Sequence, residues 1–362
     1  MRDPDRGLPG LPAGRRHRVL PGQAGVEKTG RPIRDVRLAL IGFGHVGRAF
    51  ARLILLKQYL LRERYGLNPV VTAVVTKSHG WARNDKGLQL SALLASDHLT
   101  EQSASPAVRA LAAEVLVEIS TLNPRTGEPA LTTMREALQA GMDVITANKG
   151  PIAYGFRELE GLAQAHGKQL RFESAVADNL PVFNLMRFGL PTAKVGLVRG
   201  ILNSTTNYLL SQAARGVPWK DALAEAQRLG IAERDPSNDL EGWDAALKAT
   251  IVANAVMGLD LKVSDVVREP VTEEVGERAC EAASRGMRIR PLAAIGPFGT
   301  RWAPVEVGPD DPFYAVDGFS MAIELDTDVA GHLAIALHQP HVEQTAFGLL
   351  ADLVDIETHR SW

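Results

Sequence analysis

The chain has 362 residues, of which 45% are hydrophobic and 23% are charged, and its formal net charge is -2. This composition is typical of an ordinary soluble protein with a large core, and the length predicts two or three domains. The near-zero charge gives no reason to expect binding to nucleic acid or to an anionic membrane. No apolar run approaches the roughly 20 residues of a membrane span. The single cysteine, Cys280, excludes an internal disulfide and favours a reducing, cytoplasmic compartment.

The first 34 residues are rich in arginine, glycine and proline and carry few large apolar side chains. They lack the apolar segment of a secretory signal peptide. We expect a disordered tail or an extension from an early start codon, and a basic targeting arm is the less favoured alternative.

A glycine-rich turn follows the first predicted strand. Val36–Ile41 is a short β-prone run, and a helical run begins at Arg48. Between them lies G-F-G-H-V-G, whose glycines would permit a tight turn, the approach of a pyrophosphate and close packing of the helix on the strand. The alternative is a glycine-rich turn in some other α/β protein. The predicted dinucleotide-binding residues are Gly42, Phe43, Gly44, His45, Val46 and Gly47.

The end of the second predicted strand, Val70–Val75, indicates which dinucleotide binds. A NAD-specific fold would place Asp or Glu there to hold the ribose 2′-hydroxyl. This chain instead has Lys77 and Ser78 after the strand, with Arg83 nearby. These residues can pair with a 2′-phosphate, which favours NADP over NAD. A solvated basic loop is the alternative.

Two further strands end in polar residues that would face the same crevice, because open α/β sheets bind ligands at the carboxyl ends of their strands. Ser120 and Thr121 follow the strand Val115–Ile119, and Lys149 follows Val144–Thr146. For Lys149 the alternative is an ordinary loop lysine.

The rest of the pattern predicts further helices and strands. Predicted helices cover 88–112 (with a break at Pro106), 132–141, 156–167, 222–229 and 344–355, and predicted strands cover 169–173, 194–202, 271–272 and 321–325.

Two loops carry candidate ligands. The carbonyl groups of Val176, Asp178 and Leu180 could ligate a hard monovalent cation such as sodium. Asn203 and Thr205 belong to a run of small polar residues before a helix. Such a run suits hydrogen bonds to a substrate, and it equally suits a plain helix cap.

The segment from Glu233 to Lys248 begins as a polar loop and ends as a helix. Asp244 and Lys248 are four residues apart, so a helix places them on one face. Asn238 or Asp239 would cap this helix. Carboxylates surround the single lysine and an apolar run follows it, so the pair could move a proton to or from a substrate oxygen. The alternative is an exposed ion pair on a capped helix.

Over residues 36–355 these features resemble the homoserine dehydrogenase family, in its short form without a regulatory ligand-binding domain. Four segments carry the resemblance, and the one at Ala232–Lys248 is the most specific because it is long and irregular. In the family's order the four segments are G-F-G-H-V-G at Gly42–Gly47, T-A-N-K-G-P at Thr146–Pro151, G-I-L-N-S-T-T-N-Y at Gly200–Tyr208 and A-E-R-D-P-S-N-D-L-E-G-W-D-A-A-L-K at Ala232–Lys248.

The resemblance implies an α/β fold with a Rossmann dinucleotide-binding domain and an α+β substrate and dimerisation domain whose sheet is mostly antiparallel. The implied reaction is the NAD(P)-dependent interconversion of homoserine and aspartate 4-semialdehyde in threonine and methionine biosynthesis, by a homodimer. The expected boundaries are 1–34 for the tail, 35–175 for the first domain, 176–335 for the second and 336–362 for a C-terminal helix that returns to the first.

The resemblance also implies residue roles. Lys248 matches the family's proton-transfer lysine, Asp244 the carboxylate that positions the substrate hydroxyl, and Glu233 the acid that binds the substrate amino group. Lys149 matches the lysine at the junction of nicotinamide and substrate, so it joins both the catalytic and the cofactor-binding residues. The predicted substrate-binding residues are Glu233, Asp239, Asp244, Asn203 and Thr205.

Three departures from the family pattern put the substrate in doubt more than the fold. Ser204 replaces a usual glycine, Ala177-Asp178-Asn179 replaces Gly-Gly or Ala-Gly, and Pro340–Glu343 replaces Gly-Ala-Gly before the last helix. Two alternatives stay open: a related dehydrogenase of another small amino-acid-like alcohol or aldehyde, and a non-catalytic NADP-binding homologue. Retention of the residues with catalytic roles argues against the second.

Overall fold

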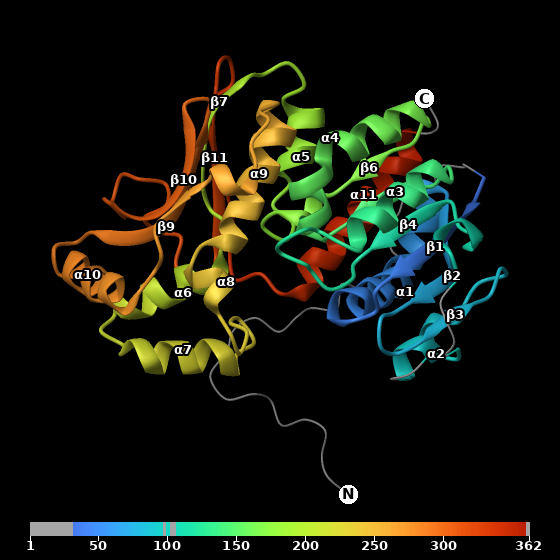
Figure 1. Ribbon diagram of the computed structural model, residues 1–362, viewed down its shortest axis with the longest axis horizontal. Helices are drawn as coiled ribbons and strands as arrows, with labels where there is room; N and C mark the ends of the chain where they lie inside the picture. The colour runs from blue at the N-terminus through green and yellow to red at the C-terminus, as the bar shows by residue number, and fades with distance from the viewer. Residues whose placement is uncertain (1–31, 97–98, 102–105, 360–362) are drawn as a thin grey trace, which may run out of the picture.

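The computed structural model describes residues 32–96, 99–101 and 106–359. Most of the expected N-terminal tail lies outside these residues, and the first strand begins at Arg34. The described chain contains two six-stranded sheets with helices packed around them (Figure 1). The predicted fold class, a Rossmann domain followed by an α+β domain, is confirmed.

The first sheet has the strand order β3-β2-β1-β4-β5-β6. Its short edge strand β3 runs antiparallel to β2, whereas its other neighbouring strands pair in parallel. The order changes direction between β1 and β4, which is where doubly wound sheets bind dinucleotides. The strands are β1 (Arg34–Ile41), β2 (Leu67–Val75), β3 (Trp81–Arg83), β4 (Val115–Glu118), β5 (Asp143–Thr146) and β6 (Leu170–Arg171).

Helices cover both faces of this sheet. Leu38 and Leu40 of β1 pack with α1 and α11 in one buried cluster, whereas Ala39 belongs to the cluster formed with α3 and α4. Apolar residues on both faces are typical of parallel strands, which are buried on each side. The helices are α1 (His45–Tyr65), α2 (Leu90–Ala95), α3 (Ala130–Gln139), α4 (Lys149–Ala165) and the C-terminal α11 (Val342–His359), with a 3-10 turn at Val108–Ala110.

The second sheet has the order β12-β11-β7-β9-β10-β8 and is antiparallel except for the β10–β8 pair. Its strands are β7 (Val195–Ile201), β8 (Val267–Arg268), β9 (Arg288–Gly296), β10 (Gly299–Val307), β11 (Met321–Thr327) and β12 (Gly331–Leu337). Its helices are α5 (Val182–Asn184), α6 (Ser204–Ala213), α7 (Trp219–Arg228), α8 (Ser237–Leu240), α9 (Trp243–Met257) and α10 (Glu273–Ser284). Short 3-10 or π turns lie at Glu173–Ala175, Leu185–Gly189 and Val263–Asp265.

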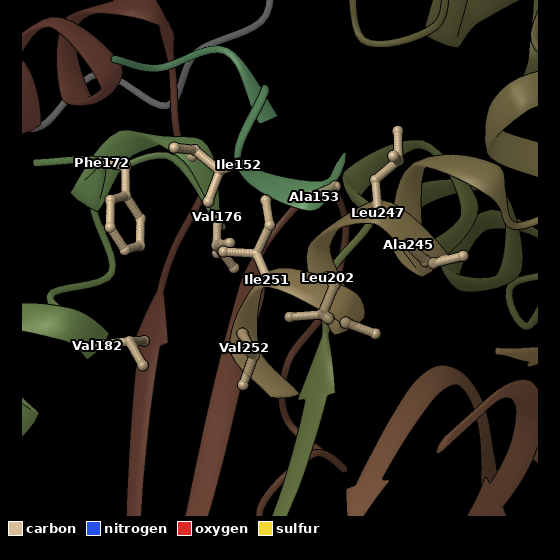
Figure 2. Close-up of a cluster of buried hydrophobic side chains, with 14 of the residues drawn as sticks. Ile152, Ala153, Phe172, Val176, Val182, Leu202, Ala245, Leu247, Ile251 and Val252 are labelled. Carbon is tan, nitrogen blue, oxygen red and sulfur yellow. The ribbon is translucent and has the colours of Figure 1, made fainter. Parts of the chain in front are cut away.

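Helix α9 connects the two domains, because it packs against α4 of the first and β9 of the second. Figure 2 shows Ile251 of α9 beside Ile152 of α4 and Val176, and Leu247 of α9 toward Ala153 of α4, all in one buried cluster. Burying each such aliphatic side chain stabilises the fold by about 1.5–3 kcal/mol. The charged residues at the start of α9 are therefore held by a helix that cannot shift without disturbing both domains.

Three local predictions are wrong. The helix expected over 88–112 is reduced, among the described residues, to α2 and one 3-10 turn, because Ser96 is already extended (φ -110°, ψ 143°). The strand expected at 271–272 does not form, because Thr272 is the N-cap of α10, where its side chain accepts the Val275 N–H. Neither Asn238 nor Asp239 caps α9, since both lie in α8 and the N-cap is Gly242.

The helix expected over 156–167 begins earlier, at Lys149. Asn148 caps it by accepting the Gly150 N–H at 3.2 Å, and Pro151 is tolerated in a first helical turn, where its missing N–H is not needed. A kink at Gly155 (φ -134°) marks where the predicted helix would have started. Lys149 is therefore held by a helix rather than by a loop.

Among the described helices, none combines the length and the apolar content that crossing a bilayer would require.

A pair of buried acids, Glu173 and Asp352, connects α11 to the chain after β6. The Glu173 N–H donates to Asp352 at 3.0 Å, and the Glu173 carboxylate accepts the N–H groups of Phe183 and Asn184. Burial raises the pKa of Glu173 to about 7, although these N–H donors and the charge of Arg187 act to lower it. Burial, and then the charge of Glu173, raises the pKa of Asp352.

Glu173 should therefore make stability fall as pH rises. Its folded-state pKa of about 7 lies above the ordinary 4.5, so between these values the native state keeps a proton that the unfolded state releases. The free energy of unfolding should drop by about 3 kcal/mol across this window and then level off. Urea unfolding from pH 5 to 8 should show a shallower drop in Glu173→Gln, with the exposed Glu160→Gln as control. Equal slopes in wild type and Glu173→Gln would contradict the assignment.

Candidate active site

The glycine-rich turn between β1 and α1 has the geometry of a phosphate cradle. Gly42 has a φ of +104°, and a Cβ there would lie 2.4 Å from the Ile119 carbonyl oxygen. Only glycine therefore fits where the turn passes this close to the backbone after β4. A Cβ on Gly47 would lie 3.1 Å from the Gly42 carbonyl oxygen. A Cβ on Gly44 would meet nothing within 4 Å, so the backbone there faces open space.

Helix α1 begins directly after Gly44, and no side chain caps it. The first N–H groups of a helix lack partners within the helix and carry its positive dipole end, so they suit a phosphate. His45 is exposed, Val46 is half-buried, and Phe43 is buried with the Arg48 guanidinium 5.4 Å from its ring centroid. This structure thus offers a dinucleotide the open cradle that the sequence predicts.

The two basic residues predicted to bind a 2′-phosphate lie in different settings. Lys77 is exposed and lies directly after the carboxyl end of β2. It belongs to a turn that is closed by a hydrogen bond from the Thr76 hydroxyl to the Gly80 carbonyl. Arg83 pairs in register with Ala73, two residues before that end, and its Nε lies 2.7 Å from Asp85 Oδ1. The geometry favours Lys77 over Arg83 as a phosphate ligand, and the assignment stays a prediction.

A buried carboxylate that sequence reasoning missed, Glu118, organises the carboxyl ends of β4 and β5. Glu118 accepts the Ser120 N–H at 3.0 Å and lies 3.3 Å from the hydroxyl of Thr146. The Thr146 hydroxyl also accepts the Asn148 N–H at 2.9 Å, just before Lys149. Burial raises the pKa of Glu118 despite these hydrogen bonds. A lone acid in a strand gives no sequence signal for such a network.

The structure brings together the three predicted catalytic residues. The Asp244 carboxylate at the start of α9 lies between two ammonium groups, with Lys149 Nζ 2.8 Å from Oδ1 and Lys248 Nζ 2.8 Å from Oδ2. The side chains of Lys149, Asp244 and Lys248 are 23%, 13% and 12% exposed. The alternative of an exposed surface ion pair is therefore wrong.

Charge, not burial alone, sets the protonation of this cluster. Burial would raise the pKa of Asp244, but the charges of Lys149 and Lys248 outweigh it and hold that pKa well below its ordinary value. For Lys149, burial would lower the pKa, but the neighbouring carboxylates, Asp244 foremost, raise it. Asp244 is thus a permanent anion that holds two lysines in place.

Two residues predicted to bind substrate extend the cluster. Asn203 donates through Nδ2 to Asp239 at 2.7 Å and to Asp244 at 3.0 Å, while its Oδ1 accepts the Thr206 N–H and caps α6. Burial and the charge of Asp244 raise the pKa of Asp239. Asn203 therefore serves both as helix cap and as a link between the two carboxylates.

Thr205 lies at the edge of this cluster. It is buried and donates to the Ile231 carbonyl at 3.0 Å, and its hydrogen bond with Asp239 acts against the rise in the pKa of that carboxyl. Two other predicted residues lie apart from the cluster. Glu233 is exposed on the loop after α7 and makes no side-chain hydrogen bond or ion pair within the part of the chain that the structure describes. Thr121 is exposed, beside Ser120.

The loop predicted to bind sodium has unusual backbone geometry. Ala177 and Asp178 have φ values of +51° and +58°, in the left-handed region that disfavours residues with a Cβ. The Leu180 carbonyl accepts the Val182 N–H at 2.7 Å, and the hydroxyl of Thr345 in α11 donates to Asp178 Oδ1 at 3.0 Å. Among the described residues, no cluster of three or more His, Cys, Asp or Glu side chains is arranged to bind a metal.

A cavity of about 250 Å³ joins the glycine-rich turn to the lysines. A larger groove of about 1000 Å³ lies between α4 and the chain after α9, but none of the three catalytic candidates lines it. The smaller cavity is lined by Val46, Ile119, Ser120, Leu122, Ala147, Asn148, Lys149, Ser174, Ala175, Ala177, Asp178, Lys248 and Thr345.

A doubly wound sheet with a phosphate cradle, together with a cavity lined by Val46 of that motif and by two lysines that share Asp244, is typical of a nicotinamide-dependent oxidoreductase. Comparison with known proteins is more specific. The sequence model described as homoserine dehydrogenase, NAD binding domain matches residues 42–173, and the model described as homoserine dehydrogenase matches residues 181–354. The chain belongs to the homoserine dehydrogenase family.

Individual relatives agree with this assignment. A homoserine dehydrogenase from Sulfurisphaera tokodaii is 33% identical over 88% of this chain and 98% of its own length. An NAD(+)-dependent homoserine dehydrogenase from Pseudomonas canavaninivorans is 30% identical over 89% of this chain and 96% of its own. The structure of a hyperthermophilic archaeal homoserine dehydrogenase in complex with NADPH matches with a TM-score of 0.77, at 25% identity over 90% of this chain and 98% of its own.

Proposed function

We propose that this protein interconverts L-homoserine and L-aspartate 4-semialdehyde with a nicotinamide dinucleotide, as a step of threonine and methionine biosynthesis. The observation that supports the proposal is a pair of lysines, Lys149 and Lys248, that are held by Asp244 and line one cavity with Val46 of the glycine-rich motif. When bound, the nicotinamide supplies hydride acceptance from the carbinol carbon and hydride donation in reverse.

Lys248 is the residue that moves the hydroxyl proton. An ammonium group has three N–H donors, and Lys248 uses one toward the Leu202 carbonyl at 2.7 Å and one toward Asp244 at 2.8 Å. The remaining position of Nζ is left for a substrate oxygen in the cavity. As an amine, Lys248 accepts the proton of the homoserine hydroxyl, and as an ammonium it returns that proton to the aldehyde oxygen.

The other polar residues position the substrate and the lysine. Asp244 fixes Lys248 and Lys149 on opposite carboxylate oxygens, which leaves little freedom to either amine. Asn203 donates to both Asp239 and Asp244 and so holds a second carboxylate beside Asp244, near the proposed substrate position. We assign Glu233 to the substrate amino group, because its carboxylate is free of protein partners among the described residues.

The proposal is tested by initial rates of the purified protein with L-homoserine and with two analogues, one lengthened by a methylene and one lacking the amino group. We expect L-homoserine to have the highest kcat/KM. A second candidate, oxidation of another small amino-acid-like alcohol, is favoured by Asp178 and by Pro340–Glu343, where the family has small residues. A higher kcat/KM for an analogue would support this second candidate instead.

We propose NADP as the preferred cofactor, on the basis of the exposed Lys77 and Ser78 at the carboxyl end of β2. Lys77→Ala should raise the Kd of NADP about tenfold, because it removes one charge-assisted phosphate contact, and should leave that of NAD nearly unchanged. Arg83→Ala should have a smaller effect, because Asp85 already holds that guanidinium. Titration of each variant with both cofactors measures this, and equal losses for NADP and NAD would refute the assignment.

A sodium ion at the carbonyls of Val176, Asp178 and Leu180 remains a proposal that the family resemblance motivates. The Val182 N–H donates to one lone pair of the Leu180 carbonyl oxygen, so a cation would bind the second lone pair of that oxygen.

We also propose that two copies associate through the second sheet. Strand β12 lies at its edge, and Val329, in the turn between β11 and β12, is 76% exposed. An edge strand offers one row of backbone N–H and C=O groups to another chain, and an apolar neighbour favours such association. Sedimentation analysis should give the mass of a dimer. The cytoplasmic location is likewise a proposal, supported by the single cysteine.

A further inference from the structure

Asp178 occupies the cavity in a conformation that its residue type disfavours. Its φ of +58° follows a φ of +51° at Ala177, and both are L residues with a Cβ. Left-handed backbone at such residues costs of order 1 kcal/mol or more and persists where the surroundings impose it. The loop therefore holds an acidic side chain where a glycine would adopt the same backbone without strain.

Contacts from α11 fix the direction of this carboxylate. The Thr345 hydroxyl donates to Asp178 Oδ1 at 3.0 Å, and the Ser174 hydroxyl donates to the Thr345 carbonyl at 2.8 Å. Within the described chain, Oδ2 of Asp178 accepts no hydrogen bond. Asp178 and Thr345 both line the cavity that contains Lys149 and Lys248. One carboxylate oxygen is thus tied to the wall, and the other is open to a ligand beside Lys149, on which the charge of Asp178 also acts.

The position of Asp178 in the fold indicates which part of the ligand it meets. Asp178 follows β6, and its neighbours on the cavity wall, Ser120 and Asn148, follow β4 and β5. In a doubly wound sheet each half binds one mononucleotide, and the half with β2 takes the adenosine. The half with β4, β5 and β6 therefore takes the nicotinamide. Glu233, the residue assigned to the substrate amino group, comes instead from the second domain.

We propose that Asp178 determines specificity for the redox state of the cofactor, by favouring the cationic oxidised nicotinamide over the neutral reduced one. The inference rests on the proposed function. In that reaction a hydride, which is two electrons and one proton, leaves the carbinol carbon for the nicotinamide, and the hydroxyl proton leaves to Lys248. The ring loses its positive charge in this step. A fixed carboxylate in a partly enclosed cavity stabilises the charged ring by Coulomb attraction and does little for the neutral one.

The test compares the binding of NADP⁺ and NADPH to the purified full chain by calorimetric titration. Asp178→Asn keeps an oxygen for the Thr345 hydroxyl and removes the charge. We expect the ratio of the Kd of NADP⁺ to that of NADPH to rise about tenfold in this variant, mainly through weaker NADP⁺ binding. This change equals a shift of about 30 mV in the potential of the bound two-electron couple, toward a more oxidising cofactor.

Matched variants separate charge from structure. Thr345→Val removes the hydrogen bond but keeps the carboxylate, so the ratio should change less than it does in Asp178→Asn. Glu160→Gln removes an exposed charge from α4, outside the cavity, and should leave the ratio unchanged. Asp178→Gly removes the charge and relieves the left-handed backbone, so it provides a folded variant if Asp178→Asn is unstable. It should raise the ratio as Asp178→Asn does.

Three results would overturn the inference, and the third is distinguishable from the other two. An unchanged ratio in both Asp178→Asn and Asp178→Gly would contradict a role in redox-state specificity. An unchanged ratio with a raised KM for L-homoserine would assign the carboxylate to the substrate ammonium instead. Failure of the wild-type protein to bind either cofactor would contradict the proposed function itself, and it is distinguished because it appears before any substitution is made.

Discussion

Lys248→Ala is expected to lower kcat about 10³-fold and to leave the Kd of the nicotinamide dinucleotide nearly unchanged. Lys248 is the one amine that contacts both Asp244 and the Leu202 carbonyl, and no other described lysine except Lys149 reaches this carboxylate. Removing a positioned general acid–base group costs about 10²–10⁴-fold in rate. The phosphate cradle is formed by the first domain, so cofactor binding does not depend on this residue. Steady-state rates and a cofactor titration of the same preparation measure both quantities.

Two controls accompany this variant. Lys220→Ala removes an exposed lysine from α7 and should retain the wild-type rate. Lys248→Met keeps most of the aliphatic stem in its partly buried site and should lose as much activity as Lys248→Ala. A Lys248→Ala protein that retains more than a tenth of the wild-type kcat would contradict the proposed proton transfer.

Gly44→Val is expected to raise the Kd of the dinucleotide about 100-fold, equal to about 2.8 kcal/mol, with little change in Tm. Gly44 has φ -78° and ψ -152°, which any residue can adopt, and a Cβ there meets nothing within 4 Å. The new side chain would fill the space through which a pyrophosphate approaches the backbone at the start of α1. Fluorescence titration and thermal unfolding of the variant measure the two effects separately.

Two other glycines show what Gly44→Val should not do. Gly161 in α4 also has nothing within 4 Å of a Cβ, so Gly161→Val should leave both binding and stability nearly unchanged. Gly42→Ala should instead unfold the protein at lower temperature, because its Cβ would lie 2.4 Å from the Ile119 oxygen. Wild-type cofactor affinity in Gly44→Val would place the dinucleotide elsewhere.

Local spacing explains why much of the site could be predicted from the sequence. Asp244 and Lys248 share a helix face because they are four residues apart, and the glycines of the turn lie between a β-prone and a helical run. Lys149 was placed at the crevice because it follows a strand end. These signals lie within one segment each, so they do not depend on how distant segments pack.

Signals that depend on distant packing could not be predicted. Glu118 gains its role from Ser120 and from Thr146 on another strand, and the Glu173–Asp352 pair joins residues 179 positions apart. Whether Asn238 or Gly242 begins α9 is decided by the intervening helix α8, which is too short to give a periodic pattern. Arg83 looked equivalent to Lys77 until the antiparallel register of β3 placed it away from the strand end.

The measurement that tests the account most directly follows the absorbance of the reduced nicotinamide when purified protein is mixed with L-homoserine and NADP or NAD. We predict an increase whose initial rate is proportional to enzyme and saturates with L-homoserine, faster with NADP, and a decrease in the reverse direction with aspartate 4-semialdehyde. Tight cofactor binding without turnover of either substrate would contradict the assignment of Lys248, Asp244 and Lys149 to homoserine oxidation.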